Sequence, residues 1–115
     1  MEDKFSIIKN NILGKKYSLS IAFVSEKESQ NINKKYRNKN KPTNILSFPL
    51  SKNVGEIILC EAIIKKEAKN FKKTFNQFLS FLVIHGMLHL KGMRHGKMME
   101  KAEEKYLSRT KFLIK

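Results

Sequence analysis

The three histidines of the chain all lie in one short stretch, VIHGMLHLKGMRHG, at positions 85, 89 and 95. His85 and His89 are four residues apart, so on a helix both imidazoles project from the same face. Gly92 favours a left-handed helix end, which would let the chain fold back and bring His95 to the same point. Three imidazoles around one point can bind a zinc-like ion and leave a coordination position open for water or substrate. Imidazole also suits nickel, copper and iron, so the spacing leaves the identity of the metal open.

The alternative for this stretch is two histidines packed in a helix and one surface imidazole, with no metal. The absence of any other histidine, and the glycine before the third one, favour the metal site. A zinc peptidase helix of the H-E-x-x-H type carries its general base directly after the first histidine. That position holds Gly86 here, which argues against a peptidase.

Length and charge limit the classes of function. A chain of 115 residues is expected to form one domain, residues 1–115. Its 24 Lys and Arg against 10 Asp and Glu give a net charge of +14, which favours a polyanion partner, nucleic acid first and an anionic membrane surface second. The alternative is a lysine-rich protein without such a partner. The lone cysteine, Cys60, is expected to be a small buried apolar side chain. Because the sequence has one cysteine and shows neither a signal peptide nor a membrane span, the expected location is the cytoplasm.

The histidines need a framework, and the local patterns predict an α+β domain. Helices are expected over 3–14, from the N-cap Ser25 to about Tyr36, over 61–71, from the N-cap Thr74 through the first histidines, and around 102–107. Strands are expected over 17–24, 44–50 and 54–60, the last two joined as a hairpin. Pro49 should lie at a sheet edge or a strand end, because it has no N–H to donate.

Apolar side chains near the histidines are expected to be core. This applies to four aromatic residues before the histidines, Phe71, Phe75, Phe78 and Phe81, and to Ile45, Leu46 and Phe48. The same segment contains three polar residues, Thr43, Asn44 and Ser47. They could hydrogen-bond a substrate strand, although hydrogen bonds to backbone groups are the simpler role. Glu56 is the best-placed carboxylate for a general base, but it could equally face solvent, so it is not assigned a role.

A basic segment, NKKYRNKNK at residues 33–41, is the second candidate functional region. It places five cations around Tyr36: Lys34, Lys35, Arg37, Lys39 and Lys41. Clustered cations with an aromatic ring are typical of a groove that follows an RNA backbone and stacks a base. The alternative is a solvated helix end. If the segment binds RNA, affinity should fall steeply with salt.

Three blocks of the sequence resemble one family. HGMLHLKGMRH resembles the H-G-x-L-H-L-x-G-y-D-H signature of the YbeY-type endoribonucleases, which are rRNA maturation factors with a single metal ion. YRNKNKPTNILSFP and GEIILC resemble two further blocks of that family in the same order, and the likeness runs from about Ile21 to Leu107. The resemblance implies an α+β fold, with a small mixed sheet packed against helices and a central metal-binding helix. It also implies one zinc ion per chain, or another divalent transition metal, on His85, His89 and His95.

The function that the resemblance implies is metal-dependent, single-strand-specific endoribonuclease activity in ribosomal RNA maturation and ribosome quality control. The implied partners are single-stranded or ribosomal RNA and the ribosome or its proteins, with no membrane; the oligomeric state stays open. Arg37 matches the family's functional arginine, so it is the candidate to hold the scissile phosphate while the metal activates water or polarises a phosphoryl oxygen. The first alternative is a non-catalytic RNA-binding ribosome assembly factor with a structural or degenerate metal site. A metal hydrolase on another substrate is the second.

Two features depart from the family pattern. Arg94 stands where the family has an aspartate, directly before the third histidine. An arginine that pointed inward would weaken cation binding, whereas one facing solvent, or holding a phosphate, would not. The chain is also shorter than the family, mainly at its N-terminus, where an opening strand is expected to be absent or reduced.

Overall fold

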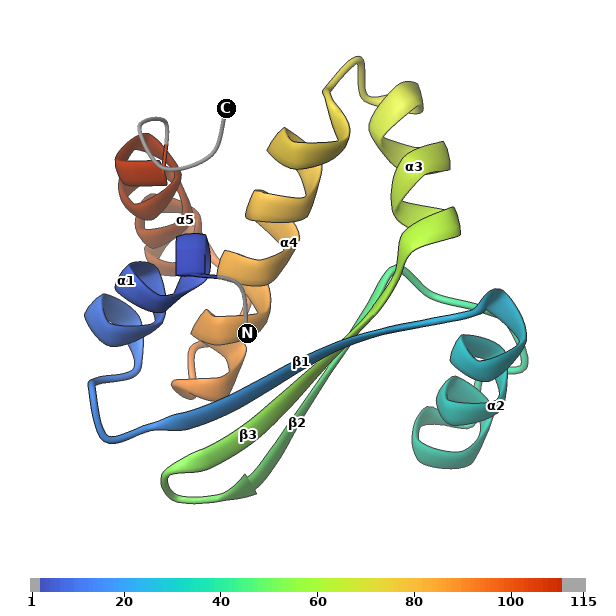
Figure 1. Cartoon of the computed structure of the whole chain (residues 1–115), viewed down its shortest axis with the longest axis horizontal. Helices are drawn as coiled ribbons and strands as arrows, with labels where there is room; N and C mark the ends of the chain where they lie inside the picture. Colours follow the sequence, from blue (N-terminus) through green and yellow to red (C-terminus); the bar gives the residue numbers. More distant parts are fainter. Residues whose placement is uncertain (1–2, 111–115) are drawn as a thin grey trace.

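The computed structural model describes residues 3–110, which form five helices and a three-stranded sheet (Figure 1). In chain order the elements are α1 (Asp3–Ile12), β1 (Ser18–Val24), α2 (Glu26–Arg37), β2 (Ile45–Ser51), β3 (Val54–Cys60), α3 (Glu61–Asn70), α4 (Phe75–Leu90) and α5 (Lys97–Thr110). This order confirms the predicted α+β class, and each expected element is present within a few residues of its predicted bounds.

The sheet is small and mixed, with strand order β1-β3-β2. β1 runs parallel to β3, and β2 runs antiparallel to it as the other half of a hairpin. Pro49 lies in β2, an edge strand, where its missing N–H costs no ladder hydrogen bond, and the register shifts between Pro49 and Ser51. The prediction for this proline is therefore confirmed.

Helix α4 lies at the centre of the core. Its residues from Leu82 to Ile84, and again Met87 and Leu88, are almost fully buried. They pack with Ile57 and Leu59 of β3 and with apolar side chains of α1, α3 and α5. In Figure 1 these four helices gather on one side of the sheet. α2 packs against the other side, where the rings of Tyr36 and Phe48 meet edge to face at 5.3 Å.

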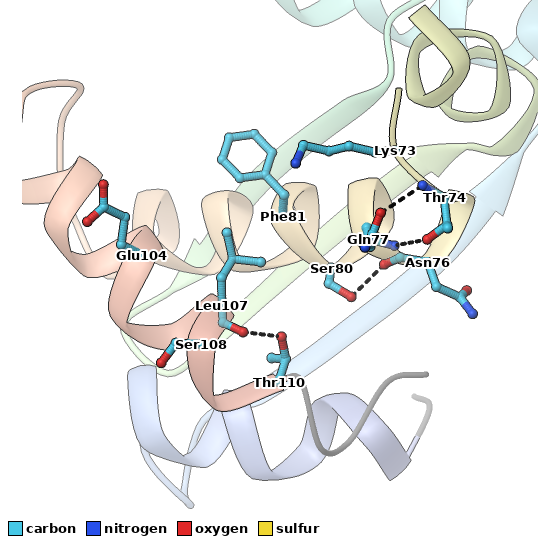
Figure 2. A pocket seen from close by; sticks show the side chains of 10 residues that line it. All are labelled: Lys73, Thr74, Asn76, Gln77, Ser80, Phe81, Glu104, Leu107, Ser108 and Thr110. Carbon is cyan, nitrogen blue, oxygen red and sulfur yellow. Dashed lines mark hydrogen bonds between the residues drawn. The ribbon is translucent and has the colours of Figure 1, made fainter. Parts of the chain in front are cut away.

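Both predicted capping boxes form. The Ser25 hydroxyl accepts the Glu28 N–H while the Glu28 carboxylate accepts the Ser25 N–H, which begins α2. Thr74 and Gln77 make the same reciprocal pair at the start of α4 (Figure 2). These hydrogen bonds fix the residue at which α4 begins.

The burial of the aromatic residues corrects one prediction. Phe78 is buried, as expected for core, but Phe71 is 63% exposed because it lies at the C-terminal cap of α3, outside the packed surface. Phe75 and Phe81 are only partly buried. Leu46 and Cys60 are buried as predicted. Among the described residues, no helix has both the length and the apolar character that crossing a membrane requires.

Candidate metal centre

The three predicted histidines meet at the C-terminal end of α4. His85 and His89 occupy successive turns of the helix, and Gly92 adopts a positive φ of 103° just after it. The chain therefore turns back, and His95 reaches the same point from the segment before α5. One ligand atom from each ring lies within 4.8 Å of the others. The predicted return at Gly92 is confirmed, and the three imidazoles form one cluster.

The donor set fits a zinc-like ion. The Nε2 atoms of His85 and His89 are 3.0 Å apart, close to the roughly 3.4 Å that two nitrogens show when each is about 2.05 Å from a tetrahedral zinc. A cation between these two nitrogens would be bound by the lone pairs of both. His85 and His89 are half-buried while His95 is exposed, so one side of the cluster is open to solvent.

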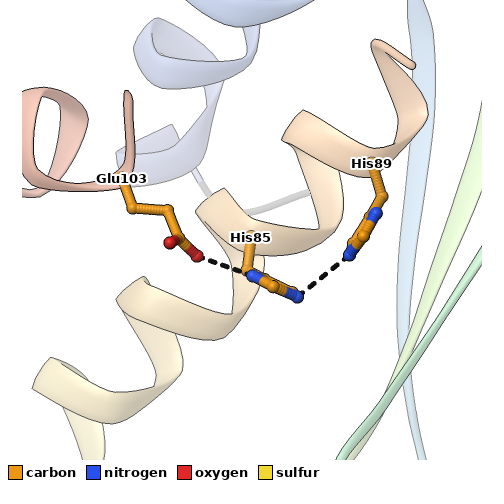
Figure 3. A network of polar contacts seen from close by, with 3 residues as sticks. All are labelled: His85, His89 and Glu103. Carbon is orange, nitrogen blue, oxygen red and sulfur yellow. Dashed lines mark hydrogen bonds and ion pairs between the residues drawn. The ribbon is translucent and has the colours of Figure 1, made fainter. Parts of the chain in front are cut away.

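A carboxylate from α5 fixes the orientation of His85. Glu103 is 9% exposed, and its Oε2 accepts a hydrogen bond of 2.6 Å from Nδ1 of His85 (Figure 3). Because the carboxylate can only accept, the ring proton belongs on Nδ1 and the lone pair on Nε2, which faces His89. This is the arrangement that orients metal-binding histidines in proteins and makes them more basic ligands.

The environment of His89 disfavours the charged form of its ring. Burial is the largest cause that lowers its pKa from the usual 6.5, followed by the charges of His85, His95 and Arg37. A hydrogen bond to the backbone of Met93 acts in the opposite direction, which identifies the partner as a carbonyl acceptor. A neutral imidazole is the form that binds metal, so the lowered pKa favours ligation at neutral pH.

Gly86 lies where α4 touches the sheet. A Cβ at this position would be 2.8 Å from Oγ of Ser47 and about 3 Å from the Cδ1 atoms of Ile45 and Ile57. The residue after the first histidine therefore points at the strands and away from the cluster. A glutamate there would be buried against isoleucine, so the peptidase arrangement has no place in this fold.

The basic segment is a solvated helix end next to the cluster. Lys34, Lys35 and Arg37 form the last turn of α2, and Lys39 and Lys41 lie in the loop that follows; all five side chains are exposed. The loop folds back on α2 through Asn33 Nδ2, which donates to the Lys41 carbonyl at 2.9 Å. Of the five cations, Arg37 is the one whose charge acts on His89. The structure thus brings Arg37 toward the histidines.

Four other polar residues take structural or external positions. Glu56 faces the sheet surface opposite α4, because side chains alternate along β3 and its neighbour Ile57 faces Gly86. Asn44 Nδ2 donates to Glu67 Oε1 at 2.7 Å, and the Thr43 backbone bonds the Ser29 hydroxyl in both directions. Arg94 is exposed, and its charge is not among the causes that lower the pKa of His89.

Glu103 is the residue of this site that the sequence analysis missed. It lies on the apolar stripe of α5 that carries Met99, Ala102 and Tyr106, all of which pack on the core. An acidic residue on such a stripe is rare unless it has a buried partner. The position of Glu103 on this apolar stripe therefore indicated a buried hydrogen-bond partner, and the histidines are the side chains that could provide it.

The chain is similar to known proteins of one family. The family model described as "Endoribonuclease YbeY" matches residues 3–112. Proteins named Endoribonuclease YbeY are 44% identical over 77% of this chain in Buchnera aphidicola, 40% over 83% in Wigglesworthia glossinidia brevipalpis, and 36% over 84% in Staphylococcus carnosus. The solution structure of a Thermotoga maritima protein aligns over 94% of this chain and 77% of its own, with a TM-score of 0.71 and 32% identity.

The chain is shorter than these relatives. It spans 64% of the Buchnera protein, 67% of the Wigglesworthia protein and 69% of the Staphylococcus protein. The matched part includes the sheet, α4 and the histidines, since the family model covers nearly the whole of the described chain.

Proposed function

The chain belongs to the Endoribonuclease YbeY family, and we propose that it is a metal-dependent endoribonuclease that cleaves single-stranded RNA in ribosomal RNA maturation. The observation that carries the proposal is the cluster of three imidazoles, one of them held by a buried carboxylate. Family membership supplies the substrate class, and the net charge of +14 favours binding of a polyanion such as RNA.

One metal ion per chain is part of the proposal. His85, His89 and His95 would hold it, and we assign zinc, with another divalent transition metal as the alternative. Bound there, the ion would supply Lewis acidity at a phosphoryl oxygen and make a water molecule more acidic. Glu103 would keep His85 in the tautomer that presents Nε2.

The remaining roles fall to the basic segment. Arg37 is the proposed catalytic residue, because a guanidinium can bind two oxygens of the scissile phosphate and its charge already reaches the cluster. The flanking phosphates of the RNA are proposed to contact four lysine neighbours of this arginine: Lys34, Lys35, Lys39 and Lys41. Their exposure leaves every ammonium accessible to a polyanion.

The wider setting follows from the same proposal. We take residues 1–115 as one endoribonuclease-like domain that acts on ribosomal RNA with the ribosome or its proteins, contributes to ribosome quality control, and works in the cytoplasm. Support comes from the family name and the basic surface.

The test compares cleavage and binding of single-stranded RNA by the wild-type chain and by His89→Ala. Cleavage should fall at least a hundredfold in the variant, whereas RNA affinity should change less than about threefold, because phosphate contacts dominate binding. Met98→Ala, which removes an exposed neighbour with 79% of its surface accessible, is the matched control and should keep full activity. Binding without cleavage by the wild-type chain, at any metal supply, would instead favour the assembly factor without catalytic activity.

A further inference from the structure

A cleft of about 840 Å³ lies between α4 and α5 (Figure 2). Its walls are the start of α4, the turn before it and the C-terminal half of α5. Phe81 and Leu107 form an apolar part, while Ser80, Ser108 and Thr110 contribute hydroxyl groups. None of the residues assigned above to metal or RNA binding lines this cleft.

Phe81 connects the cleft to the candidate metal centre. Its ring is half-buried, and its centroid is 5.9 Å from the centroid of His85, one helical turn further along α4. On its other side Phe81 stacks with Phe78 at 6.3 Å, which in turn stacks with the exposed Phe71 at 5.5 Å. A row of rings therefore leads from the cluster to the exposed end of α3, and Phe81 is the ring of this row that lines the cleft.

Among the residues that line the cleft, one is a cation and one is an anion. Lys73 lines it, and in Figure 2 its side chain extends toward the ring of Phe81. Lys69 and Lys72 are exposed on either side of Phe71. Glu104 is the one acidic residue among those that line the cleft, and it stands on the opposite wall, on α5.

We propose that this cleft binds a nucleotide of single-stranded RNA adjacent to the cleaved bond, with the base against Phe81 and a phosphate on Lys73. The proposal rests on the proposed function and extends it to a binding site beside Phe81, among residues to which no role is assigned above. An aromatic face beside a lysine is the combination by which proteins bind single strands without reading their sequence. The volume is in the range of sites that hold small ligands, so a nucleotide fits.

The absence of tryptophan from the chain allows a direct test. Phe81→Trp places one indole in the cleft, and Phe23→Trp places one at a half-exposed position on β1 as the control. The full chain, carrying its metal, is mixed with single-stranded RNA in a stopped-flow instrument, so that binding is observed before cleavage. Fluorescence of the Phe81→Trp protein should fall on binding, and that of Phe23→Trp should stay constant. An abasic oligomer of the same length should cause no fall.

A second variant tests the phosphate contact without touching the ring. Lys73→Ala should reduce the slope of log affinity against log salt by about one, the value expected for one phosphate contact. Lys16→Ala, which removes an exposed lysine from the turn between α1 and β1, loses the same charge and should leave the slope unchanged.

The outcomes separate this inference from the proposed function. If the wild-type chain cleaves RNA but the indole at position 81 does not respond and Lys73→Ala keeps the full slope, the cleft is not an RNA site and is free for a protein partner. If the wild-type chain neither binds nor cleaves RNA, the proposed function itself fails. Quenching by RNA and by the abasic oligomer alike would contradict base stacking.

Discussion

The histidine cluster and the basic segment differ in how firmly the fold holds them. In the cluster, two of the three imidazoles are half-buried, and His85 is tied to Glu103 by a bond of 2.6 Å. The basic segment holds five exposed cations, and the described residues show no ion pair to any of them. The fold thus organises the proposed metal ligands in advance, and leaves the proposed catalytic Arg37 and the lysines proposed for RNA attraction exposed to solvent.

This difference follows from what each task requires. Metal ligation depends on positions held to a fraction of an ångström, so it needs packing and hydrogen bonds around the ligands. Attraction of a polyanion depends on the number of charges, and side chains in solvent serve it without a fixed geometry. Substitutions should therefore have large effects around the cluster and small, additive ones at the lysines of the basic segment.

The largest effect is expected at the contact between α4 and the sheet. Gly86→Glu would bury a carboxylate against Ile45 and Ile57, so the free energy of unfolding should fall by about 3 kcal/mol or more. Gly86→Ala is the control. Its methyl group would meet Ser47 Oγ at 2.8 Å and two isoleucine side chains at about 3 Å, so the same free energy should fall by about 1–2 kcal/mol, less than for glutamate. Urea unfolding followed by circular dichroism measures both, and wild-type stability in the glutamate variant would contradict the packing described for α4.

The next effect is expected at the carboxylate beneath the cluster. Glu103→Gln replaces the acceptor with a neutral group, so zinc affinity should fall about ten- to a hundredfold. Glu104→Gln makes the same chemical change one residue away, at an exposed side chain, and should leave zinc affinity unchanged. Competition with a zinc-binding dye measures both. Equal affinities for the two variants would mean that the bond to His85 is incidental.

A smaller effect is expected in the basic segment. The double variant Lys34→Ala, Lys35→Ala should reduce the slope of log RNA affinity against log salt by about two, one per phosphate contact. Stability should change by less than about 0.5 kcal/mol, because both side chains are exposed. RNA binding measured at several salt concentrations tests this, with Lys15→Ala, Lys16→Ala in the turn between α1 and β1 as the matched control. A loss of binding that does not depend on salt would contradict an electrostatic role.

The smallest effect joins the two regions. In the metal-free protein the pKa of His89 should lie below 6.5, and Arg37→Ala should raise it slightly, because the arginine is the weakest of the causes that lower it. The neutral ring contributes stability that is complete above about pH 6.5 and is lost as the pH falls through the pKa of the folded state. Imidazole NMR titration measures the pKa directly. A His89 midpoint at or above 6.5 would contradict the description of its surroundings.

Local signals in the sequence were enough to predict the elements and the histidine cluster. Ser25 with Glu28, and Thr74 with Gln77, mark the starts of α2 and α4 through residues that are neighbours in the chain. The helical spacing of the histidines and the left-handed bend at Gly92 are equally local. Contacts between residues close in sequence can be inferred without knowing the fold.

Contacts between distant elements could not be predicted in this way. The bond from Glu103 to His85 joins residues 18 positions apart on separate helices, and nothing local fixes how α5 packs on α4. The expectation that Phe71 is core was wrong for a related reason, since the end of α3 projects beyond the surface that α4 covers. The cleft beside Phe81 likewise exists only because of the packing of α5.

The most direct test of the central claim is the metal content of the chain. Protein purified without a histidine tag, beside His89→Ala, is analysed by elemental mass spectrometry after zinc is supplied at neutral pH. We predict close to one zinc-like ion per wild-type chain and a large loss in the variant, because the three imidazoles act as one ligand set. A wild-type chain that holds no metal under these conditions would contradict the account and leave the cluster as three histidines in contact.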